Sequence, residues 1–305
     1  MPSLAPPKAL RPGGTIAVCA ISSPSKPERI EAAARILEGK GYRVLLAPNI
    51  AASERKYLAG TDAERLASIN RALSDPTVDA LMFARGGYGA MRILEGVDWE
   101  ALRENPRPVI GYSDLTALHQ AIAREVGIIS FHGPMLNFDI HEGLSPRSDQ
   151  WLWSMLGGDA PLTHAFESAH VISPGRADGI LFGGCLSLTA ALLATRYDYW
   201  IDGGLWVWED VDESAYRLDR MLTTLRLAGR LQTIRGVMIG RLKDCGEEPE
   251  VASLLDSFFA DSGIPVIRDL PFGHHGDNLL MPVGARCRID TNAGTLEFPE
   301  SVVKR

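Results

Sequence analysis

The sequence predicts an α/β protein whose first half forms a parallel sheet covered by helices, followed by a second domain of different texture. In the first half, short apolar runs alternate with segments of helical periodicity, which is typical of such a sheet. A proline-containing stretch then interrupts the pattern, and residues 285–298 alternate like a β-hairpin. We therefore expect an N-terminal domain over 1–150, a linker region over 151–175 and a C-terminal domain over 176–305.

The strands and helices of the first half follow one another in a regular order. Apolar runs predict strands at 15–20, 43–47, 78–84 and 108–112. Apolar residues at helical spacing predict intervening helices at 28–37, 62–73, 90–94 and 114–126. Ser25 to Glu28 and Thr61 to Glu64 have capping-box spacing, so two of these helices are expected to begin there.

The second half also mixes both kinds of element. Small residues over 183–195 favour a closely packed helix, and strands are expected at 205–208 and 237–239. Asp212 is a candidate cap for a helix that ends at Gly229, and a strong apolar stripe predicts another helix over 251–259. The tail is expected to form a hairpin around Asn292.

Composition and charge exclude several classes of function. The formal net charge is −7 and no long run of Lys or Arg occurs, which argues against a nucleic-acid partner. No apolar run approaches the roughly 20 residues that span a bilayer, and residues 1–14 lack the apolar stretch of a signal peptide. The four cysteines form no C-x-x-C pair and have no metal-ligand spacing. We expect a cytoplasmic protein without a metal or other cofactor and without membrane contact.

Ser113 stands where an apolar strand runs directly into a helix. Such a sharp strand-to-helix turn exposes a nucleophilic hydroxyl, and the N–H of the next residue, Asp114, can bind an oxyanion. Gly111 allows a close approach two residues earlier, but Leu115 stands where the second glycine of G-x-S-x-G would be. On spacing alone, a serine or aspartate that simply caps the helix explains the same pattern.

A glycine-rich loop follows the strand at 78–84. Arg85-Gly86-Gly87-Tyr88-Gly89 precedes a helix, so its backbone N–H groups suit a phosphate, a carboxylate or a developing oxyanion. The loop is neither G-x-G-x-x-G nor a Walker motif. A tight turn that merely requires glycine remains the alternative.

Two acids, Glu209 and Asp210, end the apolar strand at 205–208. A carboxylate in this place can orient a histidine, as the third member of a catalytic triad does. Either acid could instead cap the following helix or face water.

Two histidines, His274 and His275, lie in a glycine-flanked loop near the C-terminus. A general base needs a pKa near neutrality and freedom to reach the nucleophile, and histidine meets both needs. No H-E-x-x-H motif or Cys/His set accompanies the pair, so a metal site is not indicated. We interpret His275 as an ordinary loop residue.

Together these blocks resemble the LD-carboxypeptidases of peptidase family S66, which also contains the microcin C7 self-immunity proteins. The resemblance spans nearly the whole chain and rests on several blocks in the same order. They are Pro7 to Val18, Arg85 to Gly89, Gly111 to Asp114, Phe131 to Met135, Glu209 to Glu213, Tyr216 to Leu222, Pro271 to His274, and Leu279 to Gly284.

The resemblance implies roles at the matching positions. Ser113 would be the nucleophile, His274 the base and Glu209 the acid, with Glu213 and His275 as reserve candidates for the last two. The N–H of Asp114, with that of Gly86 or Gly87, would form the oxyanion hole.

Four residues are expected to contact the substrate: Arg85, Tyr88, His132 and Gly133. Among them, Arg85 is the candidate anchor for the C-terminal carboxylate, although a structural ion pair would explain it equally well.

The resemblance also implies a fold and an activity. The fold would pair a Rossmann-like N-terminal domain with a smaller, strand-rich C-terminal domain, and the protein would form a homodimer. The reaction would release the terminal D-alanine from a cytoplasmic muropeptide tetrapeptide during peptidoglycan recycling. Hydrolysis of a peptidyl- or aminoacyl-adenylate, as in the immunity subgroup, is the first alternative. A non-catalytic nucleotide-binding module is the second.

Overall fold

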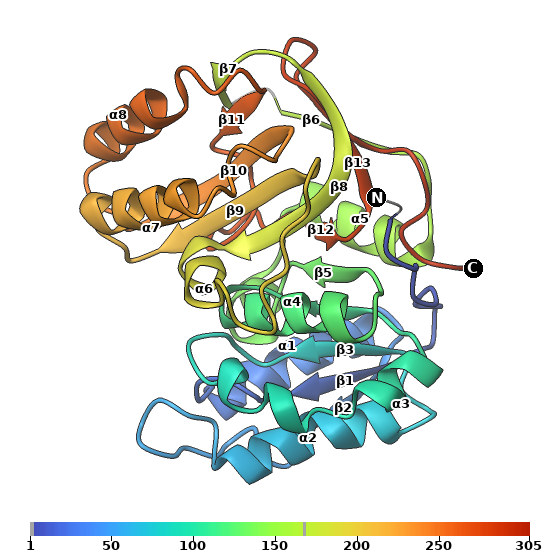
Figure 1. Cartoon of the computed structure of the whole chain (residues 1–305). Coiled ribbons are helices and arrows are strands. Elements are labelled where there is room, and N and C mark those ends of the chain that lie inside the picture. The colour runs from blue at the N-terminus through green and yellow to red at the C-terminus, as the bar shows by residue number, and fades with distance from the viewer. Residues whose placement is uncertain (1–2, 167–168) are drawn as a thin grey trace.

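The computed structural model describes residues 3–166 and 169–305 and contains two sheets (Figure 1). The first sheet has the order β12-β5-β4-β3-β1-β2, and every neighbouring pair is parallel except β12 with β5. In that order its strands are Met281–Val283, Ser130–His132, Val109–Gly111, Ala80–Phe83, Thr15–Cys19 and Arg43–Leu46. The strand–helix alternation predicted for the first half is therefore confirmed.

Helices cover both faces of this sheet. Buried residues of α1 and α5 share a cluster with one face of β1 and β3, whereas those of α2, α3 and α4 share a cluster with the other face. The five helices are α1 (Pro27–Gly39), α2 (Asp62–Ser74), α3 (Trp99–Glu104), α4 (Thr116–Glu125) and α5 (Pro146–Gly157).

The two predicted capping boxes have different outcomes. The Thr61–Glu64 box is confirmed, with the Thr61 side chain accepting from the Glu64 N–H and the Glu64 carboxylate accepting from the Thr61 N–H. The box at Ser25 is wrong: α1 is capped at Lys26 without a side-chain bond and has Pro27 in its first turn. Proline has no N–H, so this helix start leaves one donor fewer to satisfy. The helix expected at 90–94 consists of two short 3₁₀ turns.

The second sheet has the order β6-β14-β13-β8-β9-β10-β11-β7. Its central strands β8 to β11 are parallel, and antiparallel strands flank them on both sides. In sheet order the strands are Leu162–Ala165, Thr295–Phe298, Arg286–Asp290, Arg176–Cys185, Leu205–Val211, Gly236–Lys243, Val266–Arg268 and His170–Ser173. The helices that accompany it are α6 (Leu186–Ala191), α7 (Ala215–Leu227) and α8 (Glu248–Phe259).

Two expectations for this half need correction. The residues from Gly183 to Cys185 belong to the long strand β8, so the helix expected at 183–195 is wrong in its first part and α6 is short. The N-cap position of the helix after β9 is Ser214 and not Asp212, and its side chain makes no capping hydrogen bond. The tail hairpin, β13 with β14, is confirmed. The stretch expected as a linker carries the end of α5 together with β6 and β7, and the expected domain limits themselves stay a prediction.

Side-chain alternation on β9 gives its two faces different neighbours. Trp206 and Trp208 share a buried cluster with α7 and α8, which lie outside this sheet in Figure 1. Leu205 and Val207 belong to the cluster that also contains residues of the first sheet. Because side chains on a strand alternate, the next residue on this inner face is Glu209.

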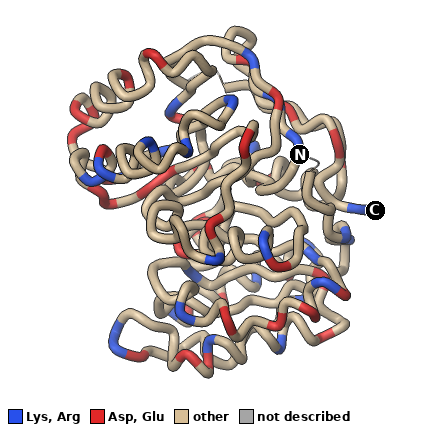
Figure 2. The backbone as a smooth tube through the Cα atoms, viewed as in Figure 1, with Lys and Arg blue, Asp and Glu red and all other residues tan. Residues whose placement is uncertain are grey.

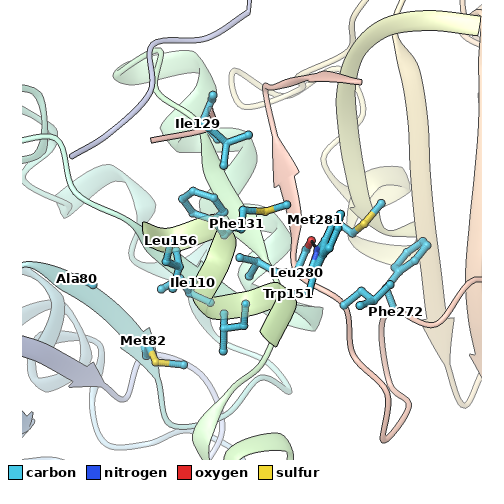
Figure 3. Packing of buried hydrophobic residues seen from close by; sticks show 14 of the residues in the cluster. Ala80, Met82, Ile110, Ile129, Phe131, Trp151, Leu156, Phe272, Leu280 and Met281 are labelled. Atoms are coloured by element: carbon cyan, nitrogen blue, oxygen red, sulfur yellow. Dashed lines mark hydrogen bonds between the residues drawn. The ribbon is translucent and has the colours of Figure 1, made fainter. Parts of the chain in front are cut away.

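One apolar cluster joins the two sheets. Phe131 of β5 and Met281 of β12 lie in it together with Trp151 of α5, and Figure 3 shows these side chains grouped around Leu280. The Trp151 indole N–H donates to the Leu280 carbonyl oxygen at 2.9 Å, so its buried polar atom is satisfied. Buried side chains of both sheets belong to this one cluster, so the two sheets pack against each other.

Charges and cysteines follow the expected pattern. Lys and Arg alternate with Asp and Glu over both halves in Figure 2. All four cysteines are buried and unpaired. Among the described residues, no helix is long and apolar enough to cross a membrane.

Candidate active site

A cleft of about 550 Å³ opens where the carboxyl ends of strands from both sheets meet. Ligands of open α/β sheets bind at this edge, because the loops that follow parallel strands converge there. The first sheet contributes the loops after β3, β4 and β5, and the second contributes the end of β10 and the loops after β9 and β11. The lining residues are Arg85, Gly86, Gly87, Tyr112, Ser113, Met135, Phe138, Asp139, Glu142, Gly143, Val211, Asp212, Lys243, His274, His275 and Gly276.

Ser113 sits on a strained turn between β4 and α4. Its φ is +62°, which non-glycine residues seldom adopt, and it begins a 3₁₀ turn that leads into the helix. A Cβ added to Gly86 would lie 2.8 Å from Ser113 Cβ and 3.0 Å from its Oγ, so only glycine fits beside this hydroxyl. Strain of this kind persists where surrounding structure enforces it, and it clusters at active sites.

The side chain of Asp114 ties the turn to two neighbouring loops. Its Oδ2 accepts from the Ser22 hydroxyl at 2.6 Å and from the Ala90 N–H at 2.8 Å. The residue is fully buried, and this burial raises the pKa of its carboxyl group despite the two hydrogen bonds. The carboxylate is thus a structural anchor, which leaves the backbone of Asp114 as its contribution to the cleft.

Three backbone N–H groups are available beside Ser113. Among the described residues, no acceptor is hydrogen-bonded to the N–H of Gly86, Gly87 or Asp114. Backbone donors without a protein partner are what a developing oxyanion requires. Gly86 and Gly87 line the cleft with Ser113, and Asp114 follows Ser113 directly, so their use as an oxyanion hole stays a prediction.

Glu209 and His274 form a close pair, and His274 lines the cleft. Glu209 lies at the end of β9 with its carboxylate fully buried, and its Oε2 is 2.6 Å from His274 Nδ1. The same oxygen accepts from the backbone N–H of His274 at 3.2 Å. A Cβ on the preceding Gly273 would lie 2.5 Å from the carboxylate, so glycine lets the loop approach Glu209. This arrangement fixes one tautomer and leaves Nε2 as the free ring nitrogen.

Glu209 and His274 each shift the pKa of the other. Burial disfavours the imidazolium of His274, but the adjacent Glu209 carboxylate outweighs burial and raises the pKa of His274 above its ordinary value. Burial likewise disfavours the carboxylate of Glu209, but His274 outweighs it and lowers the pKa of Glu209. A histidine of this kind accepts a proton readily, as a general base must.

Ser113 and His274 line the same cleft from opposite sheets. Among the described residues, Ser113 Oγ has no hydrogen-bond partner, so no bond joins it to His274 Nε2 in this structure. Catalytic hydrogen bonds are often long without substrate and tighten in the complex. The ring of Tyr112, next to Ser113, lies edge-on to the His274 ring at 4.8 Å between centroids.

The remaining predicted residues fall into two groups. Arg85 lines the cleft: its guanidinium donates to the Pro24 carbonyl at 3.2 Å and lies 5.6 Å from the centre of the Phe138 ring. No described carboxylate forms an ion pair with it. Tyr88 and Gly133 do not line the cleft: Tyr88 is exposed beside Tyr57, and a Cβ on Gly133 would collide with Leu280.

His132 is buried behind the cleft and does not line it. Its exposed fraction is 1%, and its Nε2 lies 3.9 Å from Glu209 Oε1. Burial lowers the pKa of His132 to about 4, so the ring is neutral at pH 7. It packs against Glu209 and is shielded from the cleft, and its expected contact with a substrate stays a prediction.

The two reserve candidates, Glu213 and His275, are not hydrogen-bonded to the Glu209–His274 pair. Glu213 does not line the cleft, and its carboxylate is 3.6 Å from the Arg217 guanidinium one helical turn away. His275 is exposed at the rim, where its Nδ1 accepts from the Asp277 N–H. Neither one contacts His274 or Ser113 through a hydrogen bond of the described residues.

Sequence reasoning missed Asp139, Asn278 and Lys243. Asp139 lies on a π-helical turn at Leu136–Ile140 and lines the cleft, as does Lys243 at the end of β10. Asn278 lies behind the cleft and has no exposed surface. Only Asn278 had a nearby signal, the histidine loop four residues earlier; the two others stand in segments without a motif. No group of three or more His, Cys, Asp or Glu side chains in the described part of the chain is arranged to hold a metal.

Comparisons with family models cover both halves. Residues 16–133 match the model described as the LD-carboxypeptidase N-terminal domain, and residues 178–289 match the LD-carboxypeptidase C-terminal domain. Two sequence relatives are similar over most of their length. A Bacillus subtilis protein named "Probable murein peptide carboxypeptidase" is 34% identical, covering 93% of this chain and 91% of the relative. The murein tetrapeptide carboxypeptidase of Pseudomonas aeruginosa is 31% identical, covering 92% and 94%.

Solved structures show the same fold. The muramoyltetrapeptide carboxypeptidase of Oxalobacter formigenes has a TM-score of 0.82 and 27% identity, covering 93% of this chain and 97% of its own. The microcin C7 self immunity protein MccF, in complex with aspartyl sulfamoyl adenosine, has a TM-score of 0.91 and 22% identity, covering 99% and 100%. At this identity the second likeness shows the fold alone.

Proposed function

The chain belongs to the LD-carboxypeptidase family, and we propose that it is a serine carboxypeptidase with a Ser113–Glu209–His274 triad. Its substrate would be a muropeptide tetrapeptide, cut between the L-centre of the diamino acid and the terminal D-alanine. The observation that carries the proposal is the buried Glu209–His274 pair, which faces the same cleft as a serine held at positive φ. We further propose that the protein works as a homodimer in the cytoplasm, in peptidoglycan recycling.

The first half-reaction is acylation of Ser113. His274 Nε2 takes the hydroxyl proton as Oγ attacks the scissile carbonyl carbon, and Glu209 stabilises the imidazolium that forms. The carbonyl oxygen becomes an oxyanion, which the N–H groups of Asp114 and of Gly86 or Gly87 would bind. The imidazolium then gives its proton to the departing amine of D-alanine, and an acyl-enzyme remains.

The second half-reaction is hydrolysis of that ester. A water molecule gives a proton to His274 and attacks the acyl carbon, and the Ser113 oxygen recovers the proton as the peptide leaves. Arg85 supports the specificity for a free C-terminus, because its charge faces the cleft without a carboxylate partner among the described residues. A bidentate guanidinium suits a terminal carboxylate.

Two other functions make different demands on the site. Hydrolysis of an aminoacyl-adenylate would use the same triad and would need a stacking surface, for which Phe138 is available because its ring lines the cleft and is 40% exposed. A non-catalytic nucleotide-binding module would have no use for the buried carboxylate–histidine pair. The first alternative is therefore retained as an outcome of the test.

The test is mass spectrometry of a purified muropeptide tetrapeptide after incubation with the protein. We expect the wild type to release one D-alanine and Ser113→Ala to be slower by a factor on the order of 10⁶. Ser253→Ala is the matched control, because this exposed serine lies on α8 and does not line the cleft.

The possible results separate the hypotheses. Release by the wild type and the control alone supports both the reaction and its nucleophile. Cleavage by all three proteins would mean that the assigned triad is wrong. If none cleaves the peptide, the same proteins are assayed with an aminoacyl-sulfamoyl adenosine, and hydrolysis there would support the adenylate reading.

A further inference from the structure

The two reacting groups of the proposed triad come from different sheets. Ser113 follows β4 of the first sheet, whereas His274 lies in the loop between β11 and β12, which is reached from the second sheet. The distance between them therefore depends on how this histidine loop, residues 271–278, is held against the first half. A misplacement of about 1 Å typically costs about 10²-fold in rate, so the contact that fixes the loop matters for turnover.

Asn278 closes the histidine loop on itself. Its side-chain carbonyl Oδ1 accepts from the backbone N–H of Gly273 at 2.9 Å, one residue before His274. The Leu279 N–H also donates to the Pro271 carbonyl at 2.9 Å. Asn278 has no exposed surface, so water cannot replace a lost hydrogen bond there.

The other end of the same amide reaches the first half of the chain. Asn278 Nδ2 donates to Asp139 Oδ1 at 3.2 Å, and Asp139 Oδ2 accepts from the Met135 N–H at 3.0 Å. Asp139 is 7% exposed and belongs to the π-helical turn Leu136–Ile140. Such turns are rare and are frequent at functional sites. The Asp139 carboxylate is thus held by a hydrogen bond within its own segment as well as by its bond to the histidine loop.

We propose that Asn278 and Asp139 are positioning residues that hold His274 in register with Ser113. The hydrogen-bonded series runs from the Met135 backbone through Asp139 and Asn278 to Gly273, and each step is buried. The inference rests on the proposed function only in its assignment of Ser113 and His274 as the reacting pair.

Asp139 has a second effect that a purely structural contact would not have. Three carboxylates act on the charge of His274: Glu209 in direct contact, and Asp210 and Asp139 at longer range. The Tyr112 ring lies edge-on to the His274 ring, and the neutral ring of His132 lies behind Glu209. Burial lowers the pKa of His274, Glu209 contributes the largest opposing effect, and Asp139 adds a smaller one in the same direction. Burial also raises the pKa of Asp139 to about 6. Because the Asp139 carboxylate helps to raise the pKa of His274, replacing it with a neutral amide should lower the pKa of His274.

The experiment compares three single variants with a reciprocal exchange. Asn278→Ala removes both bonds, and Asn278→Asp sets two carboxylates against each other. Asp139→Asn keeps the volume but places an NH2 donor against the donor of either Met135 or Asn278. We expect each to lower kcat by about 10²-fold with KM within about threefold. The double variant Asn278→Asp/Asp139→Asn restores an amide-to-carboxylate bond in the opposite sense and keeps acceptors for Gly273 and Met135. It should recover at least about tenfold of the lost kcat over Asn278→Asp alone.

The dependence of kcat/KM on pH is a second measurement, and a residue that only stabilised the fold would not change its midpoint. In Asp139→Asn, kcat/KM should rise with pH at a lower midpoint than in the wild type, because the base loses its proton more easily. Asn292→Asp is the matched control for the asparagine exchange, since Asn292 is exposed in the tail hairpin turn, and it should leave kcat unchanged. Near-wild-type kcat in Asn278→Ala, or a folded exchange variant without recovery, would overturn the proposal.

An arm without substrate separates this inference from the proposed function. The proton on His274 Nδ1, bonded to Glu209, is followed by NMR in the wild type and the variants. Its resonance should move in Asn278→Ala and return in the exchange variant, even if the wild type cleaves no muropeptide. An unchanged resonance would overturn the register role, as would a loss of folding in all four variants, because the bridge would then be needed for stability alone.

Discussion

The two strand ends that face the cleft contribute by different physical means. At the end of β4, Ser113 has a positive φ, its neighbouring backbone N–H groups have no acceptor among the described residues, and Gly86 leaves room for its side chain. At the end of β9, the fully buried carboxylate of Glu209 pairs with His274. The first sheet therefore contributes backbone geometry and hydrogen-bond donors, and the second contributes a pair of ionisable groups.

Glu209 and Asp210 are adjacent on β9, but their carboxyl groups have different partners and oppositely shifted pKa values. Glu209 faces His274, which holds its pKa below the ordinary value despite burial. Asp210 points to the other side, where its Oδ2 accepts from the Ser187 N–H at 2.7 Å, and burial followed by the charge of Glu209 raises its pKa to about 6. Strand alternation alone separates the two environments, so one residue of register decides which acid serves the histidine.

Among variants that keep Ser113, the largest effect should come from removing the charge on the β9 side. Glu209→Gln keeps the volume but cannot stabilise the imidazolium, and a neutral amide also allows the wrong histidine tautomer. We expect kcat to fall by on the order of 10³–10⁴, measured by D-alanine release under saturating tetrapeptide. Asp210→Asn is the adjacent control, and an equal loss there would contradict the division between the two acids.

The same variant should change the pH dependence. The free base must be neutral to act, so kcat/KM falls as pH drops through the pKa of His274, which Glu209 raises above its ordinary value in the wild type. Without Glu209, burial is left as the main influence and should bring the pKa of His274 below its ordinary value. The acid limb of the kcat/KM profile should therefore move to lower pH, and a limb that stays in place would exclude His274 as the titrating base.

A smaller loss is expected on the β4 side from Gly86→Ala. The added methyl group would lie 2.8 Å from Ser113 Cβ, so it displaces the hydroxyl and disturbs the nearby N–H groups. Losing one oxyanion donor typically costs about 10²–10³ in rate, and we expect kcat to fall within that range. Thermal melting checks that the fold is kept. Activity within threefold of wild type would mean that Gly86 has no part in the site.

The smallest effect is expected at Glu213, the reserve acid. Its carboxylate pairs with Arg217 one helical turn away and does not line the cleft. Ion pairs near the surface contribute about 0.2–1 kcal/mol, so Glu213→Gln should keep kcat within about twofold and change the melting temperature little. A loss comparable to that of Glu209→Gln would reverse the assignment of the acid.

Periodicity and turn chemistry predicted much of the fold, whereas the proposed site residues were assigned through the family resemblance. The strand–helix alternation and the Thr61 capping box are local features, and both agree with the structure. Strand β8 was missed because its glycines hide the pattern of a strand. A Cβ on Gly183 would lie 1.9 Å from the Val207 carbonyl oxygen, so the glycine reflects close contact with β9 and not a small-residue helix.

The limits at the site have a similar cause. His132 lies in a recognised block, but whether it faces the cleft or the interior depends on its strand position between β4 and β12. Asp139 and Asn278 are far apart in sequence, and nothing local in either segment indicates that they meet. Contacts between distant segments are set by the packing of the two sheets, which periodicity does not describe.

The position of β12 has a consequence for the order in which the molecule can form. This strand pairs with β5, yet almost 150 residues separate the two along the chain. During synthesis, β5 therefore presents an unpaired edge until the second sheet has been made, and open edges invite pairing with other chains. The histidine loop is joined directly to β12. Closure of the first sheet and arrival of His274 are thus expected as a single late event, so a nascent chain would carry the proposed nucleophile Ser113 without its proposed base.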